Sequence, residues 1–143
     1  WRTSVQPTAD LHGVPIRLPS TSPQPHTRKA FIGMQFAAEH HLGAEYAEAV
    51  LSAFFQQDLD IGKTDVLCDI AASVGLPVAE FAAALDDPAY AQMHDRALSI
   101  ATQSRIRAVP SVLIGEELLS GVSQPDVIRR AVERASVDLL DLD

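Results

Sequence analysis

RIRAVPSVLIGEELLSG, residues 105–121, is the stretch that decides the fold. A polar helix end runs into Val109-Pro110, and two short apolar runs follow, separated by a turn at Gly115. A proline cannot donate a hydrogen bond to a strand ladder, so Pro110 belongs at the entry or edge of a strand, where an X-Pro bond can be held cis. The pattern predicts a strand over 112–114, a hairpin, a second strand over 117–120 and then a helix, with Val109-Pro110 as a candidate cis bond.

The helix after the hairpin carries its own start signal. Ser123 is expected to cap it, with Asp126 as the capping-box partner. Val127, Ile128 and Ala131, with Ala135 further on, are expected to face inward. The tail after residue 135 alternates acidic and apolar residues and is expected to fray.

Upstream of the hairpin, apolar residues recur at helical spacing. The clearest pattern is i, i+3, i+4, i+7 and i+8, at Tyr46, Ala49, Val50, Ala53 and Phe54. Four further helices are expected: 28–42, stopped by Gly43; one from about 64 that stops at Gly75; 77–85; and a long helix from Pro88 to about Ser104.

Single residues on these helices carry their own expectations. Asp87 before Pro88 is expected to cap the long helix, with Tyr90, Met93, Ala97, Ile100 and Ala101 on its inner face. Gly33, inside the first helix, is either a weak point or a close-packing position.

The segment before the helices has a different composition. Five prolines fall between Trp1 and Pro25, which predicts a loop or extended connector over 1–26. Val14 to Leu18 alternates apolar and polar residues as an edge strand does, although Pro15 forbids a central position. Trp1 to Val5 is a further candidate strand.

The run AVPSVLIGEELLSGVSQPDVIRRAVE, residues 108–133, resembles the C-terminal part of thioredoxin-fold proteins of the DsbA family. The similarity is to the FrnE-like branch in particular, with the related 2-hydroxychromene-2-carboxylate isomerases close behind. The run YAEAVLSAFFQQDLDIGKTDVLCDIAASVGLPVAEFAAAL, residues 46–85, is similar to the family's inserted helical region. The resemblance covers roughly residues 25–134 and implies an α/β, thioredoxin-like fold with an all-helical insertion.

The resemblance also implies a division of the chain. The expected single domain, 1–143, consists of a connector (1–26), the helical insertion with the long helix (27–105), the cis-proline loop with hairpin and helix (106–135) and a tail (136–143). In FrnE-like proteins a strand, the Cys-X-X-Cys helix and a second strand precede a Trp-Arg pair that looks like Trp1-Arg2. The N-terminal strand and active-site helix are therefore expected to be absent from this chain, which begins with Trp rather than Met.

The function that the resemblance implies is thiol-disulfide exchange. In the family, the pair that matches Val109 and Pro110 forms the substrate-binding loop that faces the redox-active Cys-X-X-Cys. This chain has one cysteine, Cys68, and no Cys-X-X-Cys. It is expected to hold the substrate-binding half without the dithiol, to contain no catalytic residue and to be inactive in dithiol exchange by itself.

Two other functions stay open. One is a glutathione-dependent isomerase or transferase, for which glutathione would be the cofactor; otherwise no cofactor is expected. The other is a non-catalytic scaffold or binding domain. A Cys-X-X-Cys upstream of Trp1 would indicate the oxidoreductase, and a serine in its place would indicate the isomerase.

Cys68 itself is expected to be structural. A reactive cysteine needs cations or a helix N-terminus to lower its pKa, whereas Cys68 lies mid-helix beside Asp65 and Asp69.

The remaining polar residues give no catalytic or metal-binding pattern. The five histidines form neither a His-x-x-x-His pair nor a cluster with cysteine, so no metal site is expected; they are His12, His26, His40, His41 and His94. No G-x-S-x-G is present.

The chain departs from the FrnE-like pattern at four positions. His26 replaces a usual Asn, Phe31 a usual His and Ala108 a usual Gly, and Arg107 brings a cation next to the presumed substrate edge. Substrate preference therefore does not transfer from the family.

Composition limits the partners. The net charge is -8 with scattered basic residues, which argues against nucleic acid, and no apolar run is long enough for a membrane span. A single cysteine suits a reducing compartment, so the cytoplasm is expected. The expected partners are a protein or small thiol substrate and, along the bare sheet edge, a second copy or a complementing N-terminal segment.

Overall fold

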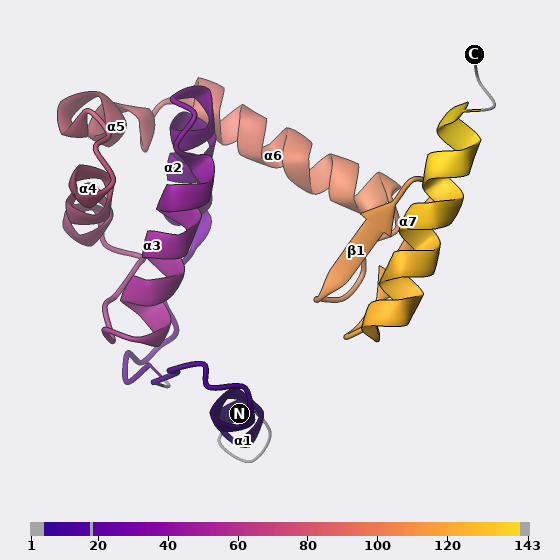
Figure 1. Ribbon diagram of the computed structural model, residues 1–143. Coiled ribbons are helices and arrows are strands. Elements are labelled where there is room, and N and C mark those ends of the chain that lie inside the picture. Colours follow the sequence, from indigo (N-terminus) through magenta and orange to yellow (C-terminus); the bar gives the residue numbers. More distant parts are fainter. Residues whose placement is uncertain (1–4, 18, 141–143) are drawn as a thin grey trace. The chain divides into compact units, whose positions relative to one another are not determined.

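A computed structural model describes residues 5–17 and 19–140, with side chains up to Ser136. The chain forms two compact units, Trp1–Arg96 and Ala97–Asp143, and each is described by itself. The elements in chain order are α1 (Val5–Leu11), α2 (Arg28–Glu39), α3 (Gly43–Phe55), α4 (Thr64–Ser73), α5 (Val78–Ala84), α6 (Pro88–Gln103), β1 (Ser111–Ile114), β2 (Glu117–Ser120) and α7 (Pro125–Leu140) (Figure 1).

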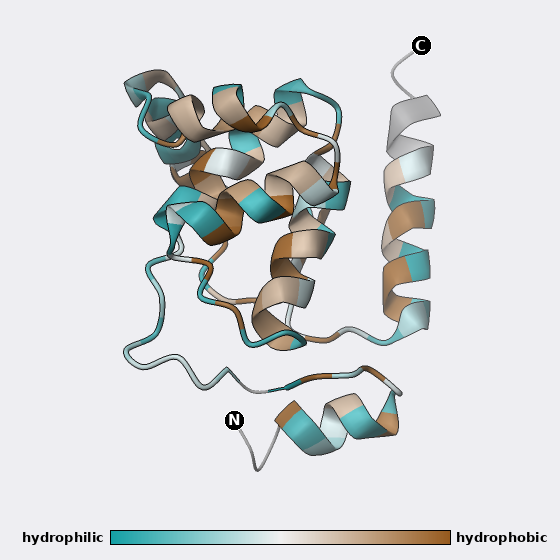
Figure 2. Ribbon diagram, turned by 90° about the vertical axis from the view of Figure 1, so that its left-hand side faces the viewer, coloured by the Kyte–Doolittle hydropathy of each residue, from teal (hydrophilic) through white to brown (hydrophobic). Residues whose placement is uncertain are grey.

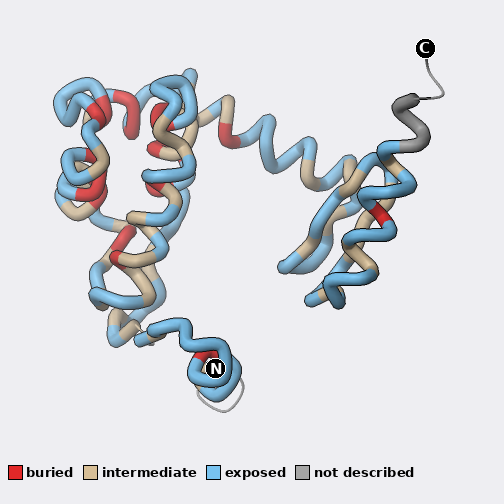
Figure 3. The backbone as a smooth tube through the Cα atoms, in the orientation of Figure 1, coloured by how far each residue is buried: buried red, intermediate tan, exposed pale blue. Residues whose placement is uncertain are grey.

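The first unit has a helical core built from α2, α3, α4 and α5. Its apolar stripes meet as their spacing predicted: Tyr46 and Ala53 of α3 are buried, as are Leu67 and Ile70 of α4. Phe81 of α5 is fully buried. In Figure 3 the buried segments gather in these helices, whereas the hairpin is mostly exposed or half-buried.

Gly33 is the point where three helices of this core meet. A Cβ built on Gly33 would lie 2.6 Å from Tyr46 Oη and 2.7 Å from Phe81 Cζ. Glycine is therefore required there for close packing, which was one of the two readings of this position.

Two of the predicted helix-end signals are confirmed. The Asp87 carboxylate accepts a hydrogen bond from the Ala89 N–H at 2.8 Å and caps α6, which begins at Pro88. Gly75, with a φ of 86°, follows α4, and its N–H donates to the Ala72 carbonyl at 3.1 Å.

The predicted stop at Gly43 is wrong, because Gly43 begins α3 instead. His41 takes the left-handed conformation after α2, with a φ of 58°, and its N–H donates to the Ala38 carbonyl at 3.1 Å. A non-glycine residue can end a helix in this way at a modest steric cost. The assumption that a glycine marks the helix end therefore placed the end of α2 too far along the chain.

The N-terminal segment is more structured than its prolines indicated. Val5–Leu11 forms α1, and its Pro7 stands in the first turn, where a missing N–H costs nothing. The expected strand from Trp1 to Val5 is wrong at Val5, and its other residues lie outside the described ones.

After α1 the chain is irregular, and no described residue between 12 and 27 belongs to a strand. The Arg17 N–H donates to the Phe55 carbonyl, and the Ser20 hydroxyl donates to Asp58 at 2.6 Å. These bonds tie the segment to the residues at and just after the end of α3.

The second unit contains an antiparallel hairpin covered by a helix. Its register pairs Ser111 with Ser120 and Ile114 with Glu117. α7 packs on β1, and a Cβ at Gly115 would lie 3.2 Å from the Ala135 methyl. Ala131 is buried as predicted, and hydrophobic residues recur along α7 in Figure 2.

The predicted ends of α7 need correction. The helix begins at Pro125, two residues after the expected cap Ser123, and the Asp126 carboxylate accepts a hydrogen bond from Arg129 instead. The helix also continues to Leu140, through the region predicted to fray. Proline is favoured at the first position of a helix, and α7 begins at Pro125 rather than directly after Ser123.

The predicted inner face of α6 is only partly right. Tyr90 and Met93 are half-buried, but Ile100 is 62% exposed and His94 is the buried residue of this helix. The ring of His94 stacks on Phe31 at 5.5 Å between centroids, so an aromatic contact takes the place of an aliphatic one.

Candidate functional site

The candidate site is the loop that leads into β1. The peptide bond between Val109 and Pro110 is cis, as the sequence predicted. Arg105 ends α6 in the left-handed conformation, with a φ of 59°, and Ile106 N–H donates to the Ala101 carbonyl at 3.0 Å. This pattern of bonds is a Schellman motif, and it turns the chain out of the helix and into the loop.

Two hydrogen bonds fix the loop against the hairpin. The Pro110 carbonyl accepts a bond from the Gly121 N–H at 2.8 Å, which continues the ladder one pair beyond Ser111 and Ser120. The Ser111 hydroxyl donates to the Ala108 carbonyl at 2.7 Å. The loop is thus held on both sides of the cis bond.

Val109 remains open to solvent. The residue is 90% exposed, and within the described chain neither its N–H nor its carbonyl has a hydrogen-bond partner. Unpaired main-chain groups beside a strand entry can pair with an added extended segment.

Val122 belongs to the same surface and was missed by the sequence reasoning. Val122 directly follows Gly121, whose N–H donates to the Pro110 carbonyl, and Val122 is also 90% exposed. Counting outward from the Pro110–Gly121 bond would have found it. Val109 and Val122 together, which we call the valine pair, offer an apolar contact at the open end of the hairpin.

The hairpin also exposes apolar residues along its length. Val112 is 43% exposed and Leu113 is 49% exposed, and successive residues of a strand point to opposite faces. Among the described residues β1 pairs with β2 alone. Its other edge therefore carries main-chain groups available to a further strand.

Cys68 has the structural character that the sequence predicted. It lies in the middle of α4, is half-buried and is free. Burial raises the pKa of the Cys68 thiol above its usual value, and Asp69 and Asp65 raise it further. At neutral pH the thiol is therefore protonated and a poor nucleophile.

The histidines have local roles or none. His40 stacks on Phe36 at 4.1 Å between ring centroids, and its Nδ1 lies 2.9 Å from the Phe36 carbonyl oxygen. His94 stacks on Phe31. The described residues contain no group of three or more side chains placed to bind a metal ion.

A cavity lies in the first unit, between α2 and α3. It measures about 350 Å³ and is lined almost wholly by apolar side chains, among them Phe31, Met34, Val50 and Phe54. The Tyr46 ring forms part of its wall, but the Tyr46 hydroxyl is buried and, among the described atoms, has no hydrogen-bond partner. The cavity offers no acid, base or nucleophile, so it carries no chemistry by itself.

The family model of the DSBA-like thioredoxin domain matches residues 2–133. The chain belongs to this family. Its helix-rich α/β structure with a small sheet agrees with the thioredoxin-like fold and helical insertion that the resemblance implied.

Two similar proteins extend the comparison. The uncharacterized protein YwbO of Bacillus subtilis (strain 168) is 41% identical over 133 residues, which are 92% of this chain and 66% of YwbO, so the chain spans just under two thirds of that relative. The structure of selenomethionine 2-hydroxychromene-2-carboxylate isomerase matches with a TM-score of 0.79 over 99% of this chain and 68% of that one. At 20% identity this second likeness shows the fold alone.

None of the helices in the described part of the chain is both long and apolar enough to cross a membrane.

Proposed function

We propose that this chain is the substrate-binding part of a thiol-disulfide oxidoreductase of the DsbA/FrnE type. The observation that carries the proposal is the cis Val109-Pro110 bond at an open strand entry, with the main-chain groups of Val109 unpaired in the described chain. An extended substrate segment pairs with these groups while its disulfide stands beside the loop.

The chemistry needs two thiols that this chain does not contain. A thiolate attacks one sulfur of the substrate disulfide, forms a mixed disulfide and releases a substrate thiolate; the second thiol then attacks the mixed disulfide and releases the other. The dithiol is oxidised by two electrons and the substrate is reduced by two. Cys68 has no second cysteine in the chain and a raised pKa, so it does not supply the first step.

Insulin reduction by dithiothreitol tests this proposal. The chain alone and its Cys68→Ser variant are expected to give the same background rate. The chain is then mixed with the separately made part of YwbO that this chain does not match, and turnover above background that is lost on Val109→Asp supports the proposal. Activity of the chain alone that disappears in Cys68→Ser would refute it.

The open edge of β1 is where we propose that a complementing segment or a second copy pairs. A two-stranded hairpin is marginal by itself, and a third strand would use the free edge and cover the exposed apolar residues Val112 and Leu113. Sedimentation of the chain is expected to show self-association that the added segment removes. A monomer that does not bind the segment would contradict this.

We further propose that the protein works in the cytoplasm, because one cysteine cannot form an internal disulfide. A glutathione-dependent isomerase remains the second candidate. The two are distinguished by whether the complementing segment carries Cys-X-X-Cys or a serine at the matching place.

A further inference from the structure

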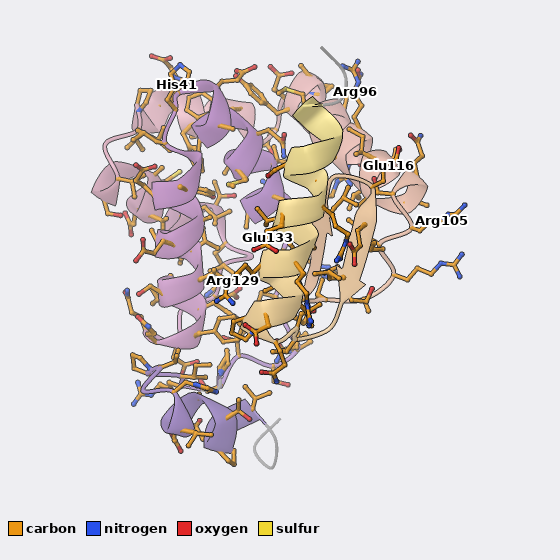
Figure 4. All side chains as sticks on the ribbon, turned by 45° about the vertical axis from the view of Figure 1, so that its right-hand side comes forward. His41, Arg96, Arg105, Glu116, Arg129 and Glu133 are labelled. Carbon is orange, nitrogen blue, oxygen red and sulfur yellow. The ribbon has the colours of Figure 1, made fainter. Side chains whose placement is uncertain are left out.

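We infer that the loop prefers extended peptide segments that carry carboxylates, and that Arg105 and Arg107 are the residues that select them. The inference rests on the proposed function, because it assigns a substrate class to the same loop. Both side chains are exposed. Arg107 stands two residues before Val109, and Arg105 stands four residues before it. In Figure 4 the side chain of Arg105 projects away from the ribbon.

The first support is that both cations are unneutralised. Within the part of the chain that the structure describes, neither guanidinium forms an ion pair or a side-chain hydrogen bond. Four other basic side chains do pair with carboxylates, at 2.6 to 2.9 Å: Arg28, Lys29, Arg129 and Arg134. The free cations on this loop are therefore available to a ligand.

The second support is the backbone of Arg105. Its φ of 59° places it at the C′ position of a Schellman motif, where glycine is favoured and a side chain costs about 1 kcal/mol. After α4 the equivalent position is occupied by Gly75. His41 and Asp58 adopt the same conformation, with φ of 58° and 60°, so what this backbone contributes is the fixed place at which the Arg105 side chain leaves the end of α6, next to the loop.

The third support is the distribution of charge along the hairpin. Glu116 and Glu117 stand at the turn, the end remote from Pro110, and Glu117 accepts a hydrogen bond from Arg134 at 2.6 Å. The Asp126 carboxylate is bound by Arg129 at 2.7 Å. The open end of the hairpin thus keeps its positive charge.

The spacing along the chain gives the preferred position of the carboxylate. Arg107 stands two residues before Val109, which is at most about 7 Å along the chain. A peptide residue that rests on the valine pair would therefore hold the side chains two positions away within reach of the Arg107 guanidinium. The expected ligand is an extended segment with an apolar residue at its centre and Glu or Asp two positions away.

Dye-labelled seven-residue peptides test the inference by fluorescence anisotropy. Each carries a central valine among threonines, with Glu, Gln or Lys two positions away on both sides, so that the direction of binding does not matter. We expect the Glu peptide to bind about three- to tenfold more tightly than the Gln peptide at low salt, and the Lys peptide to bind most weakly. The difference should shrink at about 0.5 M salt.

A preference for the Glu peptide over the Lys peptide is informative because the chain as a whole carries a net charge of -8. Long-range attraction would favour the Lys peptide, so a preference for Glu must come from local cations. Arg107→Gln and Arg105→Gly are expected to remove most of the preference. Arg134→Gln, which loses the same charge at the turn end of the hairpin, should keep it.

The outcomes separate the inference from the proposed function. If Val109→Asp abolishes binding of all three peptides but Glu and Gln bind equally to the unmodified chain, the loop binds peptides and the inference is wrong. Equal loss of preference in Arg134→Gln and Arg107→Gln would also overturn it. If no peptide binds, or if Val109→Asp changes nothing, the proposed site falls and the inference falls with it.

Discussion

Replacement of Gly33 by alanine is expected to destabilise the helical unit, although alanine is the better helix former. The added methyl would stand 2.6 Å from Tyr46 Oη, 2.7 Å from Phe81 Cζ and 2.8 Å from Phe81 Cε2. Tyr46 is 1% exposed and Phe81 is 0% exposed, so neither ring can swing into solvent. The methyl must therefore push α2 away from its neighbours or force the rings out of place.

The magnitude follows from two opposing effects. Overpacking of a filled core costs roughly 1–3 kcal/mol, and the gain in helix propensity from Gly to Ala is about 1 kcal/mol. We expect a net loss of up to about 2 kcal/mol in the free energy of unfolding, measured by urea denaturation followed by circular dichroism. Gly43→Ala is the matched control, because its methyl would lie 3.4 Å from the nearest atom, which is ordinary contact.

A second substitution identifies the atom responsible. Tyr46→Phe removes the hydroxyl that lies nearest to the added methyl and that has no hydrogen-bond partner among the described atoms. Gly33→Ala should therefore cost less in the Tyr46→Phe background than in the original chain. If Gly33→Ala proves as stable as Gly43→Ala, or if its cost is the same in both backgrounds, the packing argument is refuted.

Three further predictions concern single positions. Arg105→Gly should raise the free energy of unfolding by about 1 kcal/mol, because glycine adopts the left-handed conformation without steric cost, and an unchanged thermal midpoint would count against it. Asp87→Ala should lower stability by about 0.5–2 kcal/mol through loss of the cap on Ala89, whereas Ser123→Ala should have little effect; a loss for Asp87→Ala as small as that for Ser123→Ala would contradict the cap of α6. The alkylation rate of Cys68 by iodoacetamide should reach half its maximum at a higher pH than that of a free thiol, since its pKa is raised, and a midpoint below that of free cysteine would reverse the assignment of Cys68 as structural.

Local chemistry explains which parts of the fold could be predicted from the sequence. The stripe from Tyr46 to Phe54, the cap at Asp87 and the proline before β1 each depend on a few neighbouring residues, and all three were predicted correctly. The end of α2 was not, because His41 takes the left-handed conformation that propensity assigns to glycine. α1 was missed because Pro7 inside it and the four prolines that follow it up to residue 25 favoured a loop, although Pro7 stands where a helix accepts it.

The residues of the candidate site also differ in how far the sequence could identify them. The order of residues pointed to a strand entry at Val109 and Pro110, and the resemblance of residues 108–133 to the DsbA family made them site candidates. Val122 lies thirteen positions after Val109 and joins it only through the pairing of β1 with β2, so no local pattern pointed to it. The sequence shows that Arg105 and Arg107 stand near Val109, but whether a carboxylate pairs with them depends on where each carboxylate lies in the fold.

The buried core has a consequence for how the protein is made. The residues of its principal hydrophobic cluster all fall between Ala30 and Leu85. A ribosome therefore completes every member of this cluster before it adds β1, and the helices can pack while the hairpin is still unsynthesised. Local contacts of this kind form quickly, whereas the strands must wait for residues 111–120. The nascent chain would thus carry a finished helical scaffold at the moment when the edge most prone to mispairing leaves the exit tunnel.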